Sequence, residues 1–104
     1  MKMKSWKWDH YLCRIDGALA TTAAEADATA FQNPWDFGSI TLSNSSTSNK
    51  FVCDKLVSFD ENGNMQEVYR FSCDGWMLVS SEDGKPGATQ NLTDECYWII
   101  TSYR

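Results

Sequence analysis

The sequence lacks the patterns that mark most membrane-spanning and exported proteins. No run of about 18 apolar residues occurs, so no segment has the length of a membrane-spanning helix. The lysines near the N-terminus are not followed by the apolar segment that a signal peptide requires. We therefore expect a soluble, cytoplasmic protein that does not engage a membrane.

Closely spaced cysteines are also missing. Cys13, Cys53, Cys73 and Cys96 are far apart and contain no C-x-x-C pair. Zinc sites usually contain such pairs, so we expect no metal, and no glycine-rich phosphate loop indicates another cofactor. In the cytoplasm the four residues would be buried thiols, whereas in a secreted protein they could form disulfides in any of three pairings. We favour the reduced state.

Basic charge and histidine are scarce. The formal net charge is −5, and non-specific nucleic-acid binding needs a basic surface, so we expect no nucleic-acid partner. His10 is the only histidine, and no serine lies in a nucleophile elbow. Acid–base catalysis by His10 would need a carboxylate near it in space, for which Glu67 is the candidate. Asp9 cannot easily fill this role, because neighbours in a strand point to opposite faces.

The clearest pattern that is present predicts a hairpin over residues 51–73. Apolar residues recur at odd positions on both sides of a turn sequence at 61–64, interrupted by Lys55 and Glu67. This period of two is typical of half-buried strands. A two-residue loop at Asn62-Gly63 would put the apolar sets on opposite faces, whereas a three-residue loop at 61–63 puts them on one buried face. The predicted cross-strand pairs are Phe59 with Met65, Cys53 with Phe71, and Lys55 with Tyr69.

Before the hairpin, we predict one strand and one helix. Residues 4–15 alternate like a strand, and the change of parity near Asp9-His10 predicts a bulge or a strand covered on both faces. Residues 22–33 are rich in alanine, Thr22 and Glu25 form a capping box, and Pro34 would end the helix. The alternative for this stretch is a disordered loop. A short strand at 39–43 follows.

After the hairpin, Asp74-Gly75 predicts a tight turn and residues 76–80 a strand. Residues 82–95 show no periodicity and are predicted to be a long irregular loop, and residues 96–103 a final strand.

These elements predict one α+β domain over residues 1–104. Its fold would be a single antiparallel, curled β-meander of about five to six strands with the helix at about 22–33 packed on one face. The alternative is an all-β barrel or sandwich.

The tryptophans exceed what so small a core can hold centrally, and exposed tryptophans mark protein interfaces or platforms for sugars. The alternative is that they cover the open ends of the sheet. The residues that we predict to bind a ligand or partner are Trp6, Trp8, Trp35, Phe37, Tyr69, Trp76, Glu82 and Asp83.

Small size, acidity, surplus tryptophan and absent catalytic motifs favour a non-catalytic protein-interaction module, of the inhibitor, immunity or adaptor type and encoded on a mobile element. Its partner would be another protein or a second copy of the chain. The first alternative is a binder of a small apolar or sugar ligand in the concave face of the sheet. The second is an enzyme that uses His10 with a carboxylate. Convergence of Trp6, Trp8 and Trp35 on a pocket would favour the ligand binder.

Overall fold

Strands dominate the computed structural model, which describes residues 1–16, 18–31, 40–41, 47–48 and 52–102. The helices in these ranges are two 3-10 turns, η1 (Glu25–Asp27) and η2 (Asp94–Cys96), and none is long and apolar enough to cross a membrane. The α+β prediction is therefore wrong, and the all-β alternative fits. The strands are β1 (Lys2–Ser5), β2 (Tyr11–Ile15), β3 (Ala18–Thr22), β4 (Ile40–Thr41), β5 (Thr47–Ser48), β6 (Val52–Phe59), β7 (Met65–Cys73), β8 (Trp76–Ser80), β9 (Pro86–Thr89) and β10 (Trp98–Ser102).

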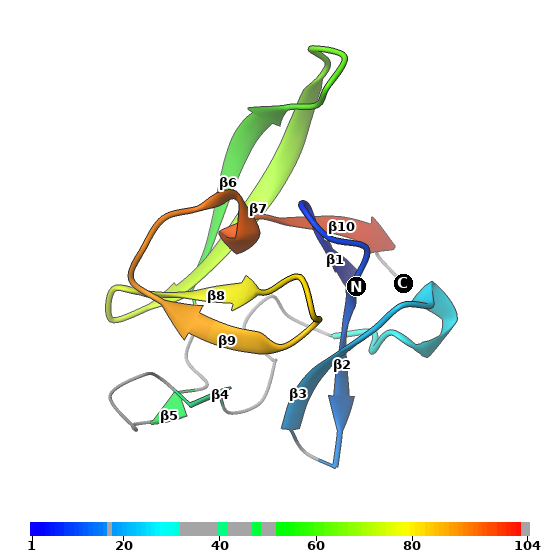
Figure 1. Ribbon diagram of the computed structural model, residues 1–104, viewed down its shortest axis with the longest axis vertical. Helices are drawn as coiled ribbons and strands as arrows, with labels where there is room; N and C mark the ends of the chain where they lie inside the picture. Colours follow the sequence, from blue (N-terminus) through cyan, green and yellow to red (C-terminus); the bar gives the residue numbers. More distant parts are fainter. Residues whose placement is uncertain (17, 32–39, 42–46, 49–51, 103–104) are drawn as a thin grey trace.

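Eight of these strands form one antiparallel sheet in the order β3-β2-β1-β10-β7-β8-β9, with β6 paired to β7 beside this path. The end strands β3 and β9 contact each other, so the sheet curls into a nearly closed barrel (Figure 1). The order also contradicts the predicted meander, because β10 lies between β1 and β7 although it comes last in the chain. Strands β4 and β5 form a separate pair.

The predicted helix at 22–33 is the largest error. Thr22 ends β3 opposite Tyr11, and the short turn η1 begins after Ala24 without a capping side chain. Farther on, Phe31 is buried and its N–H donates to the Met1 carbonyl at 2.8 Å. Helix propensity is a weak preference, and the ladder with β2 together with burial of Phe31 outweighs it. Residues 32 and 33 lie outside the described ranges.

The single strand predicted at 4–15 is in fact a hairpin. β1 pairs with β2 through Lys4 and Tyr11, and residues 6–10 connect them. Within this connection the Ser5 N–H donates to the His10 carbonyl at 2.8 Å, and Ser5 Oγ accepts the Trp8 N–H at 3.1 Å. The change of parity near His10 therefore marks a reversal of the chain rather than a bulge.

The C-terminal half follows the predictions more closely. The Asp74-Gly75 turn is present with φ values of 52° and 82°, and β8 has the predicted bounds. The predicted loop at 82–95, however, contains β9, which pairs with β8 from Ser80 and Pro86 to Met77 and Thr89. Proline fits at the start of a strand, where a missing N–H costs least.

The core lies inside the curled sheet and takes residues from most strands of it. Trp98 is fully buried at its centre, and its indole N–H donates to the Leu78 carbonyl at 3.2 Å. This bond satisfies the only polar group of the side chain. The other members of the buried cluster are Met3, Leu12, Phe31, Phe71 and Leu78.

Candidate functional site: the outer half of the β6–β7 hairpin

The predicted register of the β6–β7 hairpin is confirmed. Phe59 lies opposite Met65, Cys53 opposite Phe71 and Lys55 opposite Tyr69. Asp60 organises the loop: its Oδ1 accepts the N–H groups of Asn62 and Asn64, both at 2.9 Å. Gly63 takes the left-handed conformation, φ 78°, that this type of loop requires.

The same face of this hairpin is buried at one end and exposed at the other. Phe71 is fully buried, whereas the exposed fractions of Val57, Phe59 and Met65 are 58 %, 62 % and 73 %. The hairpin leaves the barrel and projects from it (Figure 1), and this face of its outer half is exposed. The expectation of one buried face is therefore wrong for Val57, Phe59 and Met65, which we call the tip patch.

Charged side chains mark the place where the hairpin leaves the barrel. Lys55 Nζ pairs with Glu67 Oε1 at 3.0 Å, and both side chains are exposed. The interruptions of the apolar pattern at these two positions were thus the sequence signal for exposure, and the prediction of a buried face missed it.

The outer edge of β6 carries no partner strand among the described residues. Every second residue of this eight-residue strand therefore offers its main-chain N–H and C=O groups to water or to another chain. Asp54 and Lys55 lie on this strand, and charges on an edge limit uncontrolled pairing.

A groove of about 450 Å³ lies between the hairpin tip and the connection after β1. Trp6 anchors it: the indole N–H donates to Gln66 Oε1 at 2.9 Å, and the ring meets Tyr97 edge-on with centroids 6.0 Å apart. These contacts fix the orientation of the indole. The full lining is Trp6, Lys7, Phe59, Asp60, Glu61, Gln66 and Asp94.

The other predicted aromatic residues do not converge on this groove. The Trp8 indole N–H donates to Glu95 Oε2 at 2.8 Å, and Trp8 is not part of the lining. Tyr69 and Trp76 pack against the buried core. Trp35 and Phe37 lie outside the described residues.

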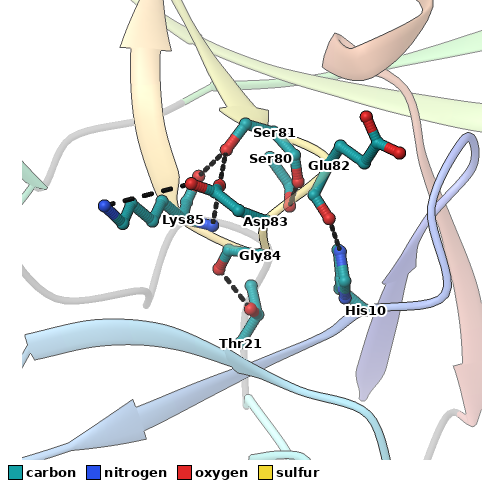
Figure 2. A network of polar contacts seen from close by, with 8 residues as sticks. All are labelled: His10, Thr21, Ser80, Ser81, Glu82, Asp83, Gly84 and Lys85. Carbon is teal, nitrogen blue, oxygen red and sulfur yellow. Dashed lines mark hydrogen bonds and ion pairs between the residues drawn. The ribbon is translucent and has the colours of Figure 1, made fainter.

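His10 and Glu67 have separate partners, and no contact joins them. His10 Nε2 donates to the Glu82 carbonyl at 3.0 Å, while Glu67 pairs with Lys55. Figure 2 shows His10 beside Thr21, whose hydroxyl donates to the Gly84 carbonyl. These two bonds connect the β2–β3 side of the barrel to the turn at 81–85, a contact region that we call the seam. The role of His10 visible in the structure is thus to close the barrel.

Asp83 holds the seam turn in shape. Its Oδ1 accepts hydrogen bonds from the Ser81 hydroxyl and, at 3.2 Å, from the Lys85 N–H (Figure 2). These bonds, the Ser81 bond above all, lower the pKa of the Asp83 carboxyl below its ordinary value. Glu82 and Asp83 are exposed, as a contact surface would require, but they lie in the seam turn and do not line the groove at the hairpin tip.

Within the described ranges, no three histidine, cysteine or acidic side chains gather as ligands for a metal ion. Burial raises the pKa of the Cys13 and Cys53 thiols, which keeps them protonated and unreactive at neutral pH. Comparison of the chain with protein-family models, with curated proteins and with solved structures found no match.

Proposed function

We propose that this protein is a binding module for another polypeptide and that the outer half of the β6–β7 hairpin is its contact surface. The observation that carries the proposal is the tip patch: three large apolar side chains share one face and are each more than half exposed. Scattered apolar residues are normal on a surface, but a contiguous group is typical of an interaction site.

The open edge of β6 supports the same surface. A partner segment can add to such an edge as a further strand, with main-chain hydrogen bonds supplying affinity and side-chain pockets supplying specificity. Phe59 ends β6, belongs to the tip patch and lines the groove, so all three features meet at one residue. A small-ligand site in the concave sheet face has less support, because Trp98 and its neighbours fill the interior.

Selection of binders from a displayed library of random peptides tests this surface. We expect most selected peptides to lose at least about tenfold in affinity when the protein carries Phe59→Ser and Met65→Ser, since buried apolar anchors dominate interface energies. The matched control carries Ile15→Ser and Leu92→Ser, which also replace two exposed apolar residues, at 57 % and 56 % exposure. We expect the control to bind as the wild type does.

Both variants change exposed side chains, so circular dichroism should show an unchanged fold for each. Peptides that bind the hairpin variant as tightly as the wild type would overturn the proposed surface. Equal losses for both variants would also count against it, because they would indicate general stickiness.

A further inference from the structure

We propose that the groove beside the hairpin tip binds an arginine side chain of the partner segment, an inference that rests on the proposed function. Two kinds of side chain line the groove and lead to this inference. Trp6 and Phe59 supply aromatic surface, and Asp60, Glu61 and Asp94 supply carboxylates. A guanidinium group is planar, stacks on aromatic rings and forms paired hydrogen bonds with carboxylates, so it is matched to both.

The charges that surround the groove leave its carboxylates without a cation. On the hairpin, Lys55 pairs with Glu67, and Arg70 Nη2 lies 3.3 Å from Asp54 Oδ2. Of the groove lining only Lys7 is cationic, and its ammonium lies over the Trp8 ring, 5.3 Å from the centroid. The groove is therefore acidic in a chain that is itself acidic, with a net charge of −5.

The groove carboxylates are also available. Asp60 uses Oδ1 for the loop N–H groups, and no described residue forms a side-chain hydrogen bond or ion pair with the carboxylates of Glu61 and Asp94. Phe59 is both the last residue of β6 and part of the groove lining, so a segment that pairs along β6 reaches one side of the groove. Charge complementarity thus selects a basic extended segment as the occupant.

A synthetic heptapeptide of alternating valine and threonine with one central arginine is the probe, and the same peptide with citrulline is its control. Citrulline keeps the shape and removes the charge. In a titration of isotope-labelled protein followed by NMR, we expect the arginine peptide to shift the Trp6 indole signal and the amide signals of residues 59–61. We expect it to bind about tenfold more tightly than the citrulline peptide, because the arginine adds the binding free energies of one cation–π contact and one or two exposed ion pairs.

Charge-matched variants separate this site from general attraction. The double variant Glu61→Gln with Asp94→Asn should weaken binding of the arginine peptide about fivefold. The control, Glu25→Gln with Asp27→Asn, makes the same change of net charge in the exposed turn η1. It should weaken binding of the peptide less than about twofold.

Failure of this inference is distinguishable from failure of the proposed function. Equal affinity for both peptides, equal weakening by both double variants, or no binding of the arginine peptide would overturn the arginine site. If library peptides without arginine still required Phe59 and Met65, the hairpin surface would stand and its partner would be an apolar strand.

Discussion

The two halves of the β6–β7 hairpin have the same strand register but opposite surroundings. In the inner half, Phe71 is fully buried in the barrel core, with Cys53 and Tyr69 packed against it. In the outer half, Phe59 and Met65 occupy the same face and are in water. The difference shows that alternation places residues on a common face, while the extent of the barrel decides which part of that face is covered.

The strongest test of this comparison replaces one phenylalanine in each half. Phe71→Ala should lower the free energy of unfolding by about 3–5 kcal/mol, because it leaves a cavity in a packed core. Phe59→Ala should change it by less than about 0.5 kcal/mol, as expected for an exposed position. Urea unfolding followed by tryptophan fluorescence measures both. Similar losses would mean that the outer half also supports the fold.

A second comparison sets the seam turn against the tip loop. Gly84 and Gly63 both have positive φ, 81° and 78°, but a Cβ on Gly84 would lie 2.8 Å from Thr21 Oγ1, whereas a Cβ on Gly63 would meet nothing within 4 Å. Gly63→Ala should therefore cost only the backbone strain, about 1 kcal/mol, and Gly84→Ala about 2 kcal/mol, because it also displaces the Thr21 bond. Thermal unfolding of both variants would show the order, and a larger loss for Gly63→Ala would contradict the role of the seam.

A smaller effect is expected from the ion pair at the boundary between the halves. Lys55→Gln, Glu67→Gln and the double variant form a cycle whose coupling energy should be about 0.5 kcal/mol, since both side chains are exposed. Added salt at about 1 M should remove most of it. A coupling that salt does not reduce would show that the pair is less exposed than the structure indicates.

The smallest effect concerns pH and the seam. Because folding lowers the pKa of Asp83, its contribution to stability is present above the ordinary carboxyl pKa of about 3.9 and is lost as the pH falls through the lower folded value. Asp83→Asn should therefore lower the melting temperature at pH 6 and matter less at pH 2. Ser81→Ala removes the largest cause of the shift and should act in the same direction. An Asp83→Asn effect that is unchanged by acid would contradict this account.

Local patterns in the sequence predicted local structure well. The hairpin register followed from a period of two and a glycine at the loop, and Asp74-Gly75 gave the next turn, because these signals depend on neighbouring residues only. Trp6 was predicted as a binding residue and does line the groove. The contribution of Asp94 could not be predicted, since it is far from Trp6 in the sequence and reaches the groove through the pairing of β10 with β1.

The errors have a common physical cause. The alanine-rich stretch 22–33 is predicted to be a helix from propensity, but Thr22 pairs with β2 as the last residue of β3, and the Thr29 N–H donates to the Leu12 carbonyl. Residues 86–89 have poor strand propensity, yet they pair with β8. In both places pairing with a neighbouring strand overrides the intrinsic preference of the residues. The tip patch was missed because apolar alternation alone describes a covered face and an uncovered one, and the prediction did not use the charges at Lys55 and Glu67 as the boundary between them.

The independence of the hairpin tip from the core has an evolutionary consequence. Substitutions at Val57, Phe59 or Met65 remove no packing from the barrel, and the open space around Gly63 leaves room for a longer loop. The outer surface of such a chain can change by drift at these few positions while selection for a stable fold acts elsewhere. The same separation makes residues 57–65 a natural place to graft foreign recognition loops.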